Sequence, residues 1–257
     1  MRVLVFVKDV PSGSAPPPYR PDLRLDRAHV DGTMSGVDLF AVAEAVRLSP
    51  DVVAATMGPA GARATLREAL AAGAARAVHV EDRTLAGADA RRTAHVLSAV
   101  VRRERPDLVL LGRESSDARM GVMAGMLAEH LGWPALSAVD RLEVEGARLR
   151  ARRRSATSID EVETSLPAVA SAAEYAATPR ALDGAALRRA YLTPIETLTA
   201  SDLGLAVADG EADMAVRDLA LTPVSRQKRV IEDATAADLL DVLAAHGVAA
   251  PVAGVTA

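Results

Sequence analysis

The amino-acid sequence predicts an α/β fold, in which a parallel sheet carries helices on both of its faces. Two observations predict it. Short apolar segments rich in valine and leucine alternate with longer segments whose apolar residues recur every three or four positions. The alternation repeats four times as strand then helix, and parallel neighbouring strands need crossover connections of this kind. A β-hairpin and an extended C-terminal arm are expected after this repeat.

The first strand is expected at residues 2–7, where Val10-Pro11 and a loop rich in proline, glycine and serine follow it. The first helix is expected at residues 38–48, with Asp38 at its N-cap and Pro50 beyond its end. Further strands are expected at residues 52–57 and 77–80. The helices after them are marked by apolar residues at helical spacing, namely Leu66, Ala69 and Leu70, and then Ala90, Ala94, Leu97 and Val101.

The central stretch of the chain runs from a fourth strand at residues 107–111 into a helix. A polar loop at residues 113–119 joins them, and Asp117 is expected to cap that loop. Such a loop directs free backbone N–H groups and the positive end of a helix dipole at a ligand, usually a phosphate. One apolar stripe on the helix is expected to consist of Met120, Met123, Ala124, Leu127 and Leu131.

Ligands of open parallel sheets bind beyond the carboxyl ends of the strands, where the strand order reverses. If the reversal lies between the first and fourth strands, residues 6–11 and 112–121 line the crevice. Later in the chain, two alternating segments about Gly146-Ala147 predict a hairpin at residues 142–154, and residues 166–173 another strand. Residues 1–196 are thus expected to form one domain, and residues 197–257 an arm that ends in a short helix at Leu239, Val242 and Leu243.

The composition of the chain argues against several classes of site and partner. The 257 residues include no cysteine, which excludes disulfides and thiolate metal sites, so electron chemistry would need a bound cofactor. A net charge of −4 without basic blocks, and only six aromatic residues, argue against nucleic acid as a partner. No apolar run approaches the ~18 residues of a membrane span, so a cytoplasmic location is expected. No metal-ligand spacing and no nucleophile motif occurs, and we therefore expect neither a metal site nor catalytic residues.

Eight segments share their order and spacing with a known family. They are residues 8–11 (KDVP), 38–47 (DLFAVAEAVR), 57–59 (MGP), 68–75 (EALAAGAA), 110–113 (LLGR), 166–169 (LPAV), 201–204 (SDLG) and 226–248. Together they resemble the β subunit of electron transfer flavoproteins, over nearly the whole chain. The resemblance implies an adenine-nucleotide-hydrolase-like sheet.

The resemblance also implies a function. The β subunit of this family is a non-catalytic electron carrier subunit that holds AMP as a structural nucleotide, or a second FAD in bifurcating members. Its heterodimer partner, the α subunit, carries the main FAD and is contacted by the C-terminal arm. Electrons arrive from flavin-linked dehydrogenases and leave to a membrane quinone oxidoreductase.

Carried over position by position, the resemblance places Phe6 beside the adenosine and Met57 near the base. The family's Asn-Pro-Phe-Asp turn falls on residues 35–38, and its phosphate loop on residues 117–125, where Met120-Gly121-Val122 replaces Thr-Gly-Gln. Arg119 could add a charge-assisted contact there. The implied cofactor-binding residues are Phe6, Ser35, Gly36, Val37, Asp38, Met57, Asp117, Arg119, Met120, Gly121, Val122, Met123, Ala124 and Gly125.

One family feature is missing. The Leu-Pro anchor that docks dehydrogenases falls on Gly184-Ala185, and the lysine-rich run after it reads RRAY at residues 188–191. Leu182 or Leu187 is the expected replacement.

Two alternatives to this function remain. A homodimeric, adenine-nucleotide-binding regulatory module of stress-protein type has the same fold class, but it does not need the long arm. An ATP-cleaving ligase of the related pyrophosphatase group would carry a Ser-Gly-Gly-x-Asp-Ser loop after the first strand, where this chain has residues 8–11 (KDVP).

Overall fold

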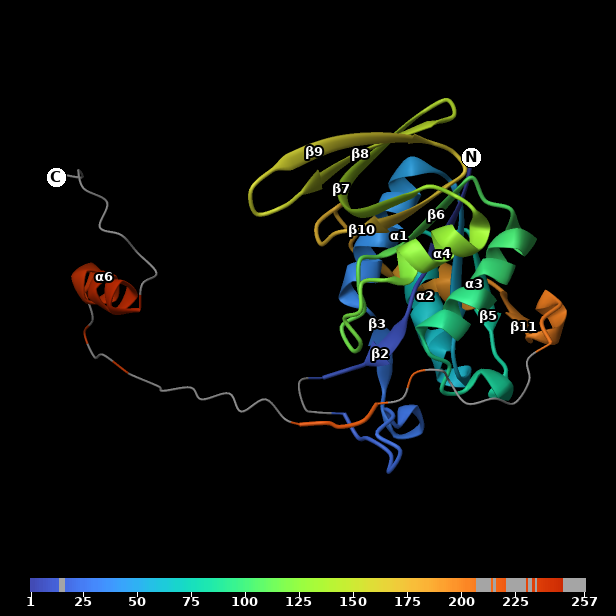
Figure 1. Ribbon diagram of the computed structural model, residues 1–257, viewed down its shortest axis with the longest axis horizontal. Coiled ribbons are helices and arrows are strands. Elements are labelled where there is room, and N and C mark those ends of the chain that lie inside the picture. Colours follow the sequence, from blue (N-terminus) through green and yellow to red (C-terminus); the bar gives the residue numbers. More distant parts are fainter. Residues whose placement is uncertain are drawn as a thin grey trace. The chain divides into compact units, whose positions relative to one another are not determined.

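The computed structural model describes residues 1–13, 17–206, 214, 216–220, 230, 233 and 235–246 (Figure 1). The chain divides into two units, Met1–Asp218 and Leu219–Ala257. The predicted boundary at residue 197 falls within a strand of the first unit. Of the tail segment at residues 226–248 that resembles the family, only residues 230, 233 and 235–246 are described.

The first unit is built on a nine-stranded sheet with the order β11-β5-β4-β1-β6-β10-β7-β8-β9. All pairs from β11 to β7 are parallel, and β7, β8 and β9 are antiparallel to one another. The predicted α/β class is thereby confirmed. The strands are β1 (Arg2–Phe6), β4 (Asp51–Met57), β5 (Arg76–Val80), β6 (Leu108–Gly112), β7 (Ala135–Glu145), β8 (Arg148–Arg154), β9 (Ile159–Ser165), β10 (Ala168–Ala172) and β11 (Ile195–Leu198).

Helices cover both faces of the sheet (Figure 1), and each face has its own hydrophobic core. On one face lie α1 (Gly36–Leu48), α2 (Arg63–Ala72) and α5 (Gly184–Leu192), and on the other lie α3 (Ala90–Glu104) and α4 (Met123–Leu131). A small hairpin of β2 (Asp9–Pro11) and β3 (Gly32–Met34) precedes α1. Single 3-10 turns occur at η1 (Arg27–His29), η2 (Ala60–Ala62), η3 (Arg83–Leu85) and η4 (Ser201–Leu203).

Two predicted helix starts are wrong. Helix α1 begins at Gly36, directly after Ser35, so Asp38 lies inside the first turn and is not the N-cap. The buried Asp38 carboxylate accepts hydrogen bonds from Lys8 and Gly112, at the ends of two strands, and not from its own helix. Helix α4 begins only at Met123, after Gly121 with a φ of +65°. Met120 is therefore outside the helix and 47% exposed, so its predicted place in the apolar stripe is wrong.

The predicted hairpin is confirmed and is larger than expected. Strand β7 extends back to Ala135, where its first part pairs with β10, and β9 adds a third strand that the sequence analysis missed. The buried residues of this antiparallel part lie on one face and include Val139, Leu142 and Leu149. Its other face carries arginines and acids that pair across the strands, such as Arg150 with Glu163 at 2.8 Å.

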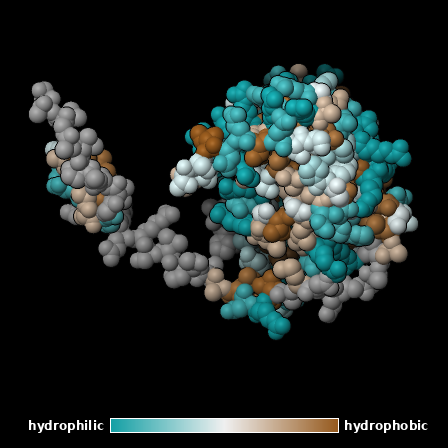
Figure 2. Space-filling model, turned by 45° about the horizontal axis from the view of Figure 1, so that its top comes forward, coloured by the Kyte–Doolittle hydropathy of each residue, from teal (hydrophilic) through white to brown (hydrophobic). Residues whose placement is uncertain are grey.

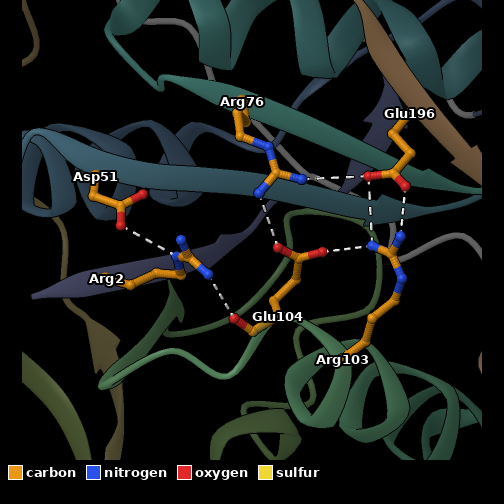
Figure 3. Close-up of polar contacts among 6 residues, drawn as sticks. All are labelled: Arg2, Asp51, Arg76, Arg103, Glu104 and Glu196. Atoms are coloured by element: carbon orange, nitrogen blue, oxygen red, sulfur yellow. Dashed lines mark hydrogen bonds and ion pairs between the residues drawn. The ribbon is translucent and has the colours of Figure 1, made fainter.

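Ion pairs connect the amino ends of the parallel strands (Figure 3). The carboxylate of Glu104, at the end of α3, is only 5% exposed and lies 3.2 Å from Arg76 and 2.6 Å from Arg103. Glu196 pairs with the same two arginines at 3.3 and 2.5 Å. Arg2 bonds to Asp51 and to the carbonyl of Glu104. The charged groups at this edge of the sheet are thus paired with one another.

The second unit contains α6 (Ala236–Ala245), which confirms the predicted final helix. Thr235 and Asp238 form a capping box at its start. No residue of α6 is buried, and Leu239 and Leu240 are each 59% exposed. Hydrophobic residues are visible on the surface of this helix (Figure 2). Among the described residues, no helix has the length and apolar character that crossing a membrane requires.

Candidate functional site

The strand order reverses beside β1, which meets the condition under which residues 6–11 and 112–121 were expected to line the crevice. From β1 the chain proceeds to β4 and β5 on one side, and then crosses to β6 on the other side. The crossovers on the two sides of β1 therefore lie on opposite faces, and ligands of open parallel sheets bind beyond the carboxyl ends of the strands at such a point. We refer to this place, beyond the ends of β1 and β6, as the crevice. The fourteen predicted site residues come from segments at this edge of the sheet.

Asp38 holds the two strand ends in place. Its Oδ2 accepts the backbone N–H of Lys8 at 2.7 Å, and its Oδ1 accepts that of Gly112 at 2.9 Å. Burial raises the pKa of this carboxyl to about 7, although both N–H groups and the Lys8 charge favour its ionised form. Through these two hydrogen bonds the Asp38 carboxylate connects the first turn of α1 to the backbone after β1 and to the end of β6.

A cluster of charged residues crosses the crevice. The Asp117 carboxylate lies 2.7 Å from Lys8 Nζ and 2.8 Å from Arg27 Nη2, and its side chain is 13% exposed. Lys8 also donates to Ser115 Oγ at 3.2 Å, and Arg27 donates to the carbonyl of Asp9 at 2.9 Å. Burial raises the pKa of Asp117, but the two cations and the hydrogen bonds outweigh burial and hold it below its usual value. The predicted loop-capping role of Asp117 is wrong, because Ser115 Oγ accepts the N–H of Ala118 instead.

The N-terminus of α4 opens on the crevice. Its N-cap residue, Val122, has no side-chain hydrogen bond to the helix, so the first-turn N–H groups have no side-chain cap. A Cβ added at Gly125 would meet no atom within 4 Å, and one added at Gly121 only the Arg113 carbonyl at 3.9 Å. The backbone here has the space and the donors that a phosphate requires. Arg119 is exposed and also has a positive φ, of 48°.

Five further predicted residues lie at the ends of β1 and β4 and around the start of α1. Phe6 is 5% exposed and Met57 is half-buried, and both contact the core under α3 and α4. Ser35 is fully buried, and its Oγ has no hydrogen-bond partner. Gly36 is exposed with open space beside it, and Val37 is half-buried. A buried hydroxyl without a partner, together with uncovered N–H groups and open glycines, fits a polar ligand such as a nucleotide.

Arg27 was missed by the sequence analysis. Lys8 and Ser115 lie in the two segments that were expected to line the crevice, residues 6–11 and 112–121, but neither was named as a cofactor-binding residue. Arg27 lies 90 positions before Asp117 in the chain, so no local pattern connects them. Among the described residues, no group of three or more acids and histidines could hold a metal ion.

Comparison with known proteins shows the family of this chain. The family model described as electron transfer flavoprotein domain matches residues 22–203. The electron transfer flavoprotein subunit beta of Mycobacterium leprae is 30% identical over 233 residues, which cover 86% of this chain and 88% of that protein. The human subunit beta is 32% identical, covering 85% and 89%, and that of Thermoanaerobacterium thermosaccharolyticum is 31% identical, covering 79% and 80%. The chain therefore belongs to the family of electron transfer flavoprotein beta subunits.

Proposed function

We propose that this chain is the β subunit of a heterodimeric electron transfer flavoprotein and binds AMP as a structural nucleotide. The α subunit would carry FAD, which supplies the electron-accepting ring when bound. Flavin-linked dehydrogenases would donate electrons, and a membrane quinone oxidoreductase would receive them. The chain itself would act as a carrier subunit without catalytic residues, in the cytoplasm.

The observation that supports AMP binding most strongly is the crevice between β1 and β6. The uncapped first turn of α4 and the open backbone at Gly121 and Gly125 suit the phosphate. Phe6 and Met57 offer apolar contacts to the adenosine at the ends of β1 and β4. The unpaired Ser35 hydroxyl offers one buried hydrogen bond, worth about 0.5 to 1.5 kcal/mol.

The dehydrogenase would dock on α5. Leu182 and Leu187, the two expected anchors, are 47% and 53% exposed, and Leu192 is 68% exposed. A shallow groove of about 530 Å³ runs along this helix, lined by Ala185, Arg188, Arg189, Leu192, Thr193 and Pro194. Arg67 fixes the end of the helix, because its guanidinium donates to the carbonyls of Ala190 and Thr193. An apolar surface with cationic residues suits a partner with an apolar pocket and an acidic rim.

The arm would contact the α subunit through α6. Thr235 and Asp238 cap this helix, and its Leu239 and Leu240 are exposed. Exposed apolar helix residues of this kind favour a partner that covers them.

Co-expression with an α subunit tests the proposal. We expect a yellow 1:1 complex that releases FAD and AMP on denaturation. Two FAD per dimer and no AMP would assign the crevice to a second flavin. A colourless homodimer that does not bind any α subunit would refute the proposal and favour the regulatory module.

A further inference from the structure

Two cations from outside the loop that precedes α4 have an anionic partner within that loop. Lys8, after β1, and Arg27, in η1, both contact the carboxylate of Asp117, at 2.7 and 2.8 Å. The three residues come from three separate segments, and Asp117 lies in the same loop that leads to Gly121 and the first turn of α4.

A carboxylate in this position cannot bind a phosphate, because both groups are anions. It can only compete with a phosphate for Lys8 and Arg27, or lower the positive potential that a phosphate experiences. The side chain of Asp117 is 13% exposed, so water screens this effect only in part. Lys8 and Arg27 are 40% and 34% exposed and can turn towards a ligand without unfolding the site.

We propose that Asp117 is an internal counter-ion of the nucleotide site, which weakens the binding of anions and thereby selects nucleotides with few phosphates. Asp117 has this role only if the crevice binds an adenine nucleotide, as proposed above. The Coulomb energy between the carboxylate and a ligand grows in proportion to the ligand's charge. ATP carries about twice the charge of AMP at neutral pH, so the penalty that Asp117 imposes is larger for ATP.

The test compares AMP and ATP binding to the nucleotide-stripped full-length chain, alone and in complex with the α subunit, by titration calorimetry at low salt. Asp117→Asn keeps the shape of the side chain and removes its charge. We expect affinity to rise about threefold for AMP and about tenfold for ATP, since the factor for AMP is squared when the ligand charge doubles. Raising the salt concentration should reduce both factors.

Two further variants separate this role from a general charge effect. Glu114→Gln removes the same charge from the same loop, but Glu114 pairs with Arg113 and not with Lys8 or Arg27. It should leave the ratio of ATP to AMP affinity unchanged. Arg27→Gln should lower the affinity for ATP more than that for AMP. The thermal unfolding midpoint of each variant shows whether it has folded.

The possible outcomes are distinct. Equal changes in Asp117→Asn and Glu114→Gln, or no change in either, overturn the counter-ion role while wild-type AMP binding stands. Binding of AMP by Asp117→Asn but not by the wild type supports the counter-ion role and refutes AMP as the resident nucleotide. Binding by neither chain overturns both.

Discussion

Asp38 and Gly112 are in direct contact at the carboxyl edge of the sheet. Oδ1 of Asp38 accepts the N–H of Gly112 at 2.9 Å, and a Cβ added at Gly112 would lie 2.3 Å from that oxygen and 3.0 Å from the Asp38 nitrogen. The first turn of α1 is thus packed on the end of β6 with no room for a side chain. This contact sets the position of every residue from Ser35 to Asp38 relative to the crevice.

Replacing Gly112 by alanine should lower the free energy of unfolding by about 1 to 3 kcal/mol, because the new methyl group forces α1 away from β6. Urea unfolding measures the loss. Gly125→Ala is the matched control, since its added Cβ meets no atom within 4 Å. Alanine in α4 should raise stability by about 0.5 to 1 kcal/mol. Equal stability of the two variants would contradict the packing described.

Asp38 should make stability depend on pH. Burial raises its pKa in the folded chain to about 7, whereas the unfolded chain has the ordinary value near 3.8. Between these values the folded state binds more protons than the unfolded state, so the contribution of Asp38 to stability decreases as the pH rises from about 4 to about 7. Asp38→Asn removes this contribution.

The measurement for Asp38 is the difference in unfolding free energy between wild type and Asp38→Asn, taken at several pH values. This difference cancels the titration of groups that do not interact with Asp38. A difference that stays constant from pH 4 to pH 7 would refute the raised pKa.

Glu104 should matter more to stability than the exposed ion pairs around it. Its carboxylate is 5% exposed and contacts Arg76 and Arg103, so Glu104→Gln leaves both guanidinium groups without their buried partner. We expect a loss of about 1 to 2 kcal/mol, since the arginines remain partly hydrated. Asp51→Asn, in the same network but 47% exposed, should cost less than about 1 kcal/mol. If Glu104→Gln and Asp51→Asn lower the urea midpoint by the same amount, burial of Glu104 does not increase its contribution to stability.

The sequence predicts most of the parallel core because strands such as β1, β4 and β6 are mainly apolar and the helices between them have apolar residues at helical spacing. It fails where structure depends on distant partners. Strand β9 reads IDEVETS, with only Ile159 and Val162 strongly apolar, and it is held by pairing with β8. Strand β11 has four residues and depends on β5.

In the candidate site, too, features set by local sequence are predictable and features set by distant partners are not. The loop after β6 is predictable because a buried strand followed by glycine and a helix is a local pattern. The role of Asp38 is not predictable, because its partners Lys8 and Gly112 lie 30 and 74 positions away. In the sequence, an aspartate near the start of a helix has the pattern of an N-cap. Only the packing of α1 against β6 shows that Asp38 forms its hydrogen bonds with other segments.

Leu187 should be required for electron transfer from the dehydrogenase. Leu187→Asp places a charge on the apolar surface of α5, and we expect kcat/KM for the dehydrogenase to fall at least tenfold with FAD content unchanged. Ile159→Asp is the control, since Ile159 is 58% exposed against 53% for Leu187 but lies on β9, at the opposite edge of the sheet from β11. Equal rates for both variants would place the docking surface elsewhere.

Leu239 and Leu240 should contribute to binding of the α subunit. Each is 59% exposed on α6, and a double change to aspartate would bury two charges in the interface that we propose. We expect the dissociation constant of the heterodimer, measured by sedimentation, to rise at least tenfold. Circular dichroism should show that α6 is retained, because the Thr235 and Asp238 capping box is unchanged. Asp241→Asn, on the same helix, should bind like the wild type, and a heterodimer equally stable in the leucine variant would exclude α6 from the interface.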